Sequence, residues 1–450
     1  MKTVLLKVFL LLYLTTGWTQ GSGLGDKLNE IAEAYENVYG FSGSILVASN
    51  NRVSFEKSYG YANRSFDIKN TRDTRFSINS ISKTFTALAI LLLAEDNKVE
   101  LHKPIKEYLP TLEAIWGDSI TIHHLLTHTS GLPRESGIQP HQNLNFKEQL
   151  DLIEKQSLLF TPGARYEYSN AGITVLGAII ERISDLGYEA FLQQNIIEAL
   201  NLNNTGYYSG KNVVKRLAVP YRITSNGLEF AQRSKHLGDN AGGGLYSTPS
   251  DLFKFIKAVE ANRLLSKEYT KLLFQPYVKS GETDFEAYVW SIKYFGEEKI
   301  YFAAGSGYGT KSVIIRLPET GGFIGITSNW GNTPILQLLR DLYLSTKGAS
   351  VDLPYEDELA NPELFAEHFG TYFFDKEELT KHLGINKTNI KLHEVEGRLF
   401  MDDELLASEN KSLKLTYTDE LKISFEKGVM IIEINGNRIT GKRSRNPEKG

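Results

Sequence analysis

Apolar positions along the chain follow two spacings, and the change from one to the other marks out the expected elements. Spacings of three and four predict helices with one buried face, whereas alternation over short runs predicts strands. In the first 350 residues, strands are expected over residues 44–48, 53–59, 287–294, 300–303, 311–316 and 323–327. Helices are expected over residues 26–39, 122–126, 146–156, 171–184, 188–200, 252–261 and 333–344.

One further helix is apolar on every side, because almost no polar residue occurs between Phe85 and Leu93. Such a helix is expected to be buried on all its faces. Ser80 and Lys83 come just before this run, and their spacing of three places them on the same helix face. A serine beside a lysine at the start of a buried helix indicates a nucleophile and its base. The alternative is a capping hydroxyl beside a lysine that extends to solvent.

The Ser-x-x-Lys spacing alone does not identify a site, because it occurs in three other places. These are Ser54/Lys57, Ser408/Lys411 and Ser424/Lys427. Each of them belongs to a stretch with strand-like alternation, where residues i and i+3 face opposite sides of the strand. A serine and a lysine so placed cannot act together locally, which leaves Ser80 and Lys83 as the candidate pair.

The order of these elements predicts the fold of the larger part of the chain. Strands come first, helices fill the middle, and strands return before a last helix. This order predicts one antiparallel sheet built from both ends of the region, with helices on its faces and a helical part inserted. The expected class is α/β in the broad sense, or α+β. A cleft between the sheet and the inserted helices is a favoured place for a ligand site.

Strand-like alternation dominates beyond residues 346–357, where Gly348 and Pro354 interrupt the helical pattern. Strands are expected over residues 371–374, 389–395, 398–402, 413–418, 421–425, 429–434 and 437–441. Turns that contain glycine separate several of them, which favours a meander that closes into a small barrel or sandwich. We therefore expect a first domain over residues 21–346, a linker over 347–357 and a C-terminal β domain over 358–450.

The first 20 residues have the pattern of a secretory signal. Lys2 precedes a run from Val4 to Tyr13 that is apolar except for Lys7, and small or polar residues follow. This run is too short to span a membrane, for which about 20 apolar residues are needed. We therefore expect a secreted or periplasmic protein whose mature chain has no membrane span. The alternative is a buried N-terminal helix.

Composition excludes several classes of function. The chain has no cysteine, so it has no disulfide, thiolate metal site or cysteine nucleophile. A formal net charge of −4 gives no indication of nucleic-acid binding. His124 and His128 have the i, i+4 spacing of a helical zinc pair, but no glutamate lies between them, and a packed helix is the better interpretation. We expect neither a metal nor a cofactor.

A second polar group stands where a turn leads into another apolar helix. Tyr168 and Asn170 occupy the entrance to the helix expected over residues 171–184. A free lysine has a pKa near 10.4, so Lys83 needs burial or a nearby cation or phenol before it can act as a base at neutral pH. Tyr168 is the candidate phenol.

Taken together, these segments resemble the serine β-lactamase-related family, which includes class C β-lactamases, D-alanyl-D-alanine carboxypeptidases and many esterases. The resemblance covers roughly residues 41–344 and depends on the order of several modest motifs. They are Phe41–Val47, Ser80–Lys83 with Phe85 and Ala87, Ile120–Pro133, Tyr168–Asn170 and Gly242–Thr248.

The resemblance implies a role for each polar residue. Ser80 would attack a carbonyl carbon and become acylated, while Lys83 takes its proton. Tyr168 would pass a proton to the leaving group and help to activate the water that removes the acyl group. Asn170 would bond to Lys83 and to the substrate amide. The implied activity is that of an exported serine hydrolase acting on an ester or amide bond of a peptide-like substrate.

The family's third motif aligns best with the run that begins at Ala303, and it departs from the family there. Gly305 matches the motif's glycine, and the N–H groups of Ser80 and Ser306 would then stabilise the oxyanion. Ala303 stands where the family has a lysine or histidine, which argues against efficient β-lactam or carboxypeptidase turnover. Lys311 follows nearby, and as an alternate strand residue it is expected to face solvent.

Ala303 also motivates an alternative from another class. The chain would then be a non-catalytic or weakly active penicillin-binding-like protein that senses peptidoglycan through an old hydrolase cleft. The four intact polar residues, Ser80, Lys83, Tyr168 and Asn170, favour the enzyme. In either case the expected partner is a small-molecule or peptide-like ligand, with cell-wall fragments among the candidates.

Overall fold

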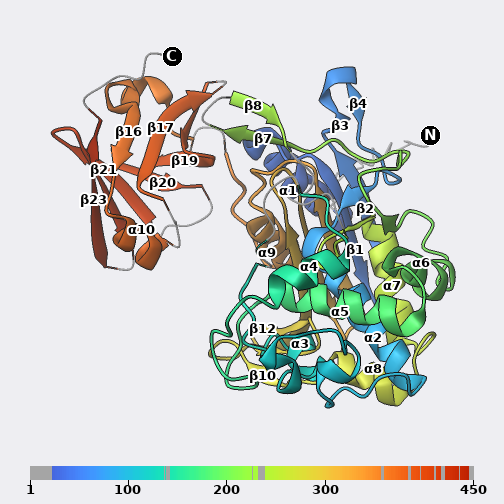
Figure 1. Ribbon diagram of the computed structural model, residues 1–450. Coiled ribbons are helices and arrows are strands. Elements are labelled where there is room, and N and C mark those ends of the chain that lie inside the picture. The colour runs from blue at the N-terminus through green and yellow to red at the C-terminus, as the bar shows by residue number, and fades with distance from the viewer. Residues whose placement is uncertain are drawn as a thin grey trace, which may run out of the picture.

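The computed structural model describes residues 23–135, 137, 142–224, 227–231, 239–355, 359–383, 387–395, 397–409, 412–416, 421–434 and 436–444. The expected secretory signal over residues 1–20 lies outside these ranges. The described chain forms a larger part built on an eight-stranded sheet and a closed β-barrel near the C-terminus, drawn in orange to red in Figure 1. Among the described residues, no helix is both long and apolar enough to cross a membrane.

The central sheet is antiparallel and joins strands from both ends of the larger part, as predicted. Its order is β10-β11-β12-β13-β14-β15-β1-β2. The strands are β1 (Gly43–Ser49), β2 (Arg52–Tyr59), β10 (Val278–Lys279), β11 (Phe285–Glu286), β12 (Ser291–Phe295), β13 (Glu298–Ser306), β14 (Lys311–Leu317) and β15 (Gly322–Ser328). The join lies between β1 and β15, where Ile45 is opposite Ile326.

One expected strand begins later than its sequence suggested. Residues 287–290 make a tight turn in which the N–H of Ala287 donates to the carbonyl oxygen of Trp290 at 2.8 Å. Val289 has a positive φ of 55°, a conformation that no regular strand adopts. The strand predicted over residues 287–294 is therefore β12, and it begins only at Ser291.

Helices cover both faces of the sheet. Alternate side chains of β1 belong to two different core clusters, one on each face. Ile45 and Val47 belong to a cluster that includes side chains of α1 (Leu24–Tyr39) and α9 (Ile335–Thr346). Leu46 and Ala48 belong to a cluster with α2 (Ser82–Glu95) and α7 (Pro249–Glu260). Successive strand residues point to opposite faces, so each face has its own apolar layer.

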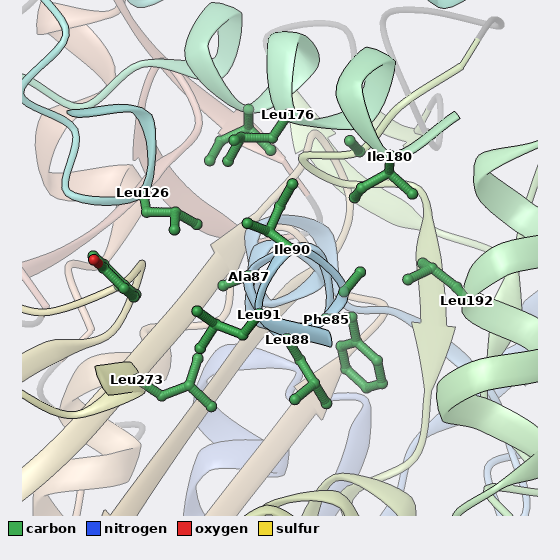
Figure 2. Packing of buried hydrophobic residues seen from close by; sticks show 14 of the residues in the cluster. Phe85, Ala87, Leu88, Ile90, Leu91, Leu126, Leu176, Ile180, Leu192 and Leu273 are labelled. Carbon is green, nitrogen blue, oxygen red and sulfur yellow. The ribbon is translucent and has the colours of Figure 1, made fainter. Parts of the chain in front are cut away.

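Helix α2 is buried on all sides, as its sequence predicted. Figure 2 shows Phe85, Ala87, Leu88, Ile90 and Leu91 spreading around the helix toward side chains of the surrounding elements. Phe85 also stacks on Phe255 of α7, with ring centroids 4.1 Å apart. Full burial of each such side chain stabilises the fold by about 1.5–3 kcal/mol. The surrounding helices are α3 (Ile122–Leu126), α5 (Asn170–Ser184), α6 (Tyr188–Leu192) with the π-helix Gln193–Glu198, and α8 (Lys267–Leu273).

The inserted region also contains short strands that the sequence did not predict. The largest of these is the hairpin of β7 and β8, where a loop or helix was expected. The remaining elements of the larger part are α4 (Phe146–Ile153), β3 (Tyr61–Asn63), β4 (Ile68–Lys69), β5 (Phe76–Ser77), β6 (Gly206–Tyr207), β7 (Tyr221–Thr224), β8 (Gly227–Phe230) and β9 (Leu245–Ser247).

The C-terminal part is a closed barrel of eight strands, which confirms the barrel alternative. Its strands are β16 (Gly370–Phe373), β17 (Asn389–Val395), β18 (Arg398–Met401), β19 (Glu404–Glu409), β20 (Ser412–Leu415), β21 (Leu421–Glu426), β22 (Val429–Ile434) and β23 (Asn437–Arg443). Pairing of β16 with β23 closes it. Strand β19 and the helix α10 (Lys376–Leu383) were not predicted.

The barrel packs on the larger part through the hairpin of β18 and β19. Phe400 and Leu405 flank the turn of this hairpin, and both belong to the core cluster of α1 and α9. The side-chain amide of Asn332 donates to the carbonyl oxygen of Asp403 within the turn. A buried aromatic anchor and a side-chain hydrogen bond thus fix where this hairpin lies. The domain limits at residues 346 and 358 stay a prediction.

Candidate active site

Ser80 lies in a short 3₁₀ helix, Asn79–Ile81, that leads directly into α2. Its hydroxyl is 2.7 Å from the Tyr168 hydroxyl and accepts a hydrogen bond from Lys83 Nζ at 3.1 Å. Helix α2 has no side-chain cap at its N-cap residue, Ile81. Ser80 is therefore not a capping residue in the described structure, and its hydroxyl is held by two groups able to exchange a proton with it.

Lys83 is buried, with only 2% of its surface exposed, so it does not extend to solvent. Besides Ser80, its Nζ donates to the carbonyl oxygen of Gly242 at 2.7 Å. A Cβ atom on Gly242 would lie 3.1 Å from Nζ, so the loop that begins there passes close to the amine. The backbone of the Gly242–Thr248 motif thus contributes an acceptor for Lys83.

Tyr168 lies directly before Ser169, whose side chain caps α5. Its ring is close to two cations: Lys83 Nζ is 5.1 Å and the Arg134 guanidinium carbon 4.9 Å from the ring centroid. On another side the ring packs on the imidazole of His128, with centroids 4.7 Å apart. These neighbours fix the direction in which the phenol points at Ser80.

His128 is a functional candidate that the sequence did not identify, since it was weighed only as half of a zinc pair. It is buried, and its Nδ1 accepts the backbone N–H of Ser169 at 3.2 Å, which assigns the ring proton to Nε2. Burial, reinforced by the positive charges of Lys83 and Arg134, lowers the pKa of His128 to about 3. A neutral imidazole therefore supports Tyr168.

His124, the other histidine of the possible zinc pair, has a structural role at the start of α3. His124 lies in the first turn of α3, where its Nδ1 accepts the backbone N–H of Thr121 at 3.3 Å. Within the described ranges, no group of three or more histidine, aspartate or glutamate side chains is arranged to hold a metal ion.

Asn170 is the first residue of α5 and lines the same cavity as Ser80. Its side-chain amide donates to Glu135 Oε1 at 3.3 Å. The predicted bond from Asn170 to Lys83 is not formed in the described structure, where Lys83 bonds to Ser80 and Gly242. The side-chain oxygen Oδ1 of Asn170 still lies 3.7 Å from the position of a Gly242 Cβ, so both residues border one space.

The end of β13 passes alongside the Ser80 turn, and only a glycine permits this approach. A Cβ atom on Gly305 would lie 2.1 Å from the carbonyl oxygen of Ile78 and 2.9 Å from the backbone nitrogen of Ser80. Ser306 follows and lines both cavities that open at Ser80. The predicted role of Gly305 and Ser306 in an oxyanion site stays a prediction that this close approach supports.

Comparison with known proteins shows to which family the chain belongs. The family model described as Beta-lactamase matches residues 30–346, which is more than half of the chain. The chain belongs to the β-lactamase family. The resemblance drawn from the sequence motifs and the fold it implied are thereby confirmed.

Two proteins illustrate how similar this chain is to known members and structures of the β-lactamase family. Teichoic acid D-alanine hydrolase from Staphylococcus aureus is 28% identical over 237 residues, which are 53% of this chain and 59% of that protein. The chain thus spans less than two thirds of this curated relative. A penicillin-binding protein from Bacillus halodurans has 26% identity and a TM-score of 0.64, covering 71% of this chain and 99% of that one.

A third likeness extends over the barrel. The octameric penicillin-binding protein homologue from Pyrococcus abyssi has a TM-score of 0.66 and covers 92% of this chain and 99% of its own. Its identity of 24% establishes a shared fold and no more. The shared fold therefore extends beyond residues 30–346, which the family model matches.

Besides the Asn170–Lys83 bond, the expectation for Lys311 is also wrong. Lys311 was expected to face solvent, yet it is half-buried and lines both cavities that contain Ser80. It is the first residue of β14 and is paired with Ser306 at the end of β13. Burial lowers the pKa of Lys311, while the negative charges of Glu404 and Asp403 oppose that shift. The sequence could not show that residues of the barrel line the same cavities as Lys311.

Ala303 is buried, and it belongs to the core cluster that surrounds α2. The cleft itself consists of two adjoining cavities of about 610 and 700 Å³. Both are lined by Ser80, Tyr168 and Ser306. A substrate can therefore extend to either side of the nucleophile.

Proposed function

We propose that this protein is a serine hydrolase that cleaves ester or amide bonds through an acyl-enzyme on Ser80. One observation carries the proposal: the Ser80 hydroxyl contacts both Lys83 Nζ and the Tyr168 hydroxyl at the floor of an open cleft. A serine in this position has a proton acceptor at hydrogen-bond distance, which is the first geometric requirement for a nucleophile.

Acylation would begin when Ser80 Oγ attacks the carbonyl carbon of the substrate. A new C–O bond forms, the hydroxyl proton passes to Lys83 Nζ, and the carbonyl oxygen becomes an oxyanion. The N–H groups of Ser80 and Ser306 would stabilise that oxyanion, and loss of one such donor typically lowers turnover about 10²–10³-fold. Tyr168 would pass a proton to the departing alcohol or amine as the C–O or C–N bond breaks.

Deacylation would use the same groups in reverse. Water attacks the acyl carbon and gives a proton to Tyr168, which replaces the one that Tyr168 lost to the leaving group. Lys83 keeps the proton taken from Ser80 until the serine regains it. Collapse of the second oxyanion breaks the bond to Ser80 Oγ, which regains a proton as the carboxylic acid leaves. Tyr168 is suited to this exchange because its hydroxyl already lies 2.7 Å from Ser80 Oγ.

The proposed substrates are small acyl esters and amides, with peptide-like and aminoacyl groups among them. The name of the staphylococcal relative refers to D-alanine on teichoic acid, and a D-alanyl ester is accordingly the first aminoacyl candidate. Ala303 leaves the third motif without its family cation, which favours simple esters over β-lactams. We also propose export, supported by the pattern of residues 1–20; a mature protein whose N-terminus is still Met1 would contradict it.

A substrate panel tests the proposed function. Purified wild type is assayed with an aryl acetate, a chromogenic cephalosporin, a D-alanyl aryl ester and D-alanine amide. Ser80→Ala is expected to lower ester turnover at least about 10³-fold because covalent catalysis is lost. Ser54→Ala is the matched control, since Ser54 has the same Ser-x-x-Lys spacing but lies exposed on β2. Equal turnover by wild type and Ser80→Ala would contradict the proposal.

The alternative of a non-catalytic peptidoglycan sensor makes the opposite prediction in this panel. The wild type would then turn over no substrate while still binding muropeptides. Robust Ser80-dependent hydrolysis of any panel member would exclude it.

A further inference from the structure

The barrel contributes directly to the walls of the active-site cleft. The turn between β18 and β19 places Asp403 along one cavity at Ser80, and Glu404 along both. These two carboxylates come from a part of the chain far from Ser80 in sequence. They lie on the same cavities as Tyr168 and Ser306, so a substrate that reaches Ser80 also meets the barrel.

The position of this turn is fixed by contacts on both sides. Phe400 is buried to 1% exposure and Leu405 to 7%, both in the core cluster of the larger part. Asn332 donates to the Asp403 carbonyl oxygen, and its own side-chain oxygen accepts the N–H of Ile223 at 2.7 Å. The carboxylates are therefore held at the cleft by packing and a relay of hydrogen bonds.

Lys311 is the cation that these carboxylates influence. Its side chain lines both cavities beside Ser306, and its charge is stabilised by Glu404 and Asp403 across the cleft. Because Lys311 is half-buried, its interaction with an opposite charge is stronger than that of a fully exposed lysine.

Two other cations line the first cavity, and each of them contacts a residue of the larger part. Arg134 lies 3.6 Å from Glu135 and packs over the Tyr168 ring. Arg222 lies over the ring of Tyr308, 5.0 Å from its centroid. In the second cavity, Arg340 lies 3.4 Å from Asp341. Lys311 is thus the cation of the described cleft whose charge is opposed by groups on the barrel.

We propose that the barrel sets the charge selectivity of the active site: Lys311 binds an anionic group of the substrate, a carboxylate or a phosphate, and Glu404 competes with that group. The inference rests on the proposed function, because it names the substrate class of the same cleft. The C-terminal barrel is then a specificity element of the hydrolase, and Lys311 and Glu404 are the two residues through which it acts.

Matched substrates that differ only in charge test this proposal. The probes are 3-acetoxybenzoate, 3-acetoxyphenyl phosphate and the neutral 3-acetoxybenzamide, with kcat/KM measured at low ionic strength. For the acyl side, monophenyl succinate is compared with phenyl succinamate. Lys311→Ala is expected to lower the anionic-to-neutral ratio of kcat/KM about 10-fold or more, as the loss of a charge-assisted hydrogen bond predicts.

Glu404→Gln is expected to change the same ratio in the other direction, about 3–10-fold upward, because the competing carboxylate is removed. Both changes should shrink as salt is added, since screening weakens them. The matched controls Lys279→Ala and Glu282→Gln alter exposed charges outside both cavities and should leave the ratio at its wild-type value. Melting temperatures confirm that each variant is folded.

Two results would overturn the inference while leaving the hydrolase intact. One is an unchanged ratio in folded Lys311→Ala, and the other is an unchanged or lowered ratio in Glu404→Gln. Failure of the proposed function gives a different result, namely turnover that persists in Ser80→Ala. Comparison of the benzoate with the phosphate identifies which anion Lys311 accepts.

Discussion

At the scale of single residues, the site is organised around Tyr168 as much as around Ser80. The phenol is fixed by two nearby cations and by the neutral imidazole of His128, while its hydroxyl meets Ser80. The sequence predicted Ser80, Lys83 and Tyr168, because these residue types carry chemistry at recognisable spacings. It did not predict the supporting role of His128, since an isolated buried histidine has no periodicity that distinguishes it from a core residue.

The neutral state of His128 makes the stability of the protein depend on pH. The folded protein keeps this imidazole unprotonated down to a pKa of about 3, whereas the unfolded chain binds a proton below about pH 6.5. The unfolded state thus binds more protons as the pH falls from about 6.5 toward 3. Stability lost through this one group approaches about 1.4 kcal/mol per pH unit in that range.

His128→Asn isolates this effect. Asparagine tolerates the positive φ of 55° at this position, and its side-chain oxygen is able to accept the Ser169 N–H. Urea unfolding at pH 5, 6 and 7 should show a shallower decline of the free energy of unfolding in the variant than in the wild type. His123, whose pKa is lowered to about 4, contributes equally to both proteins and cancels. Parallel slopes would show that His128 is not held neutral.

At the scale of elements, the sequence predicted what depends on local pattern and missed what depends on tertiary position. The apolar run of α2 and the alternation in β13 and β14 were sufficient to predict these elements. The hairpin of β7 and β8 was missed because each strand is only four residues long and β8 has no buried residue. Strand β19 was missed because it directly follows the polar turn at Asp403. Lys311 was misplaced because strand alternation alone does not reveal which part of the protein covers its face.

At the scale of the whole molecule, the two parts form one cleft. The sequence predicted a sheet with inserted helices and a terminal barrel, and both are confirmed. It could not predict how they meet, because Phe400 and Leu405 resemble ordinary interior residues of a barrel yet pack outward into the core of α1 and α9. The acidic turn between them consequently lines the cleft that opens at Ser80. The C-terminal barrel thereby becomes a candidate wall of the substrate site.

The most direct test of the central claim is the intact mass of the protein after reaction with a fluorophosphonate probe under native conditions. The account predicts one adduct per wild-type chain, located on Ser80 by peptide mapping, and the same adduct in Ser54→Ala. Ser80→Ala should remain at its unmodified mass. An adduct of equal yield in Ser80→Ala, or a wild-type adduct on another serine, would contradict the assignment of Ser80 as the nucleophile.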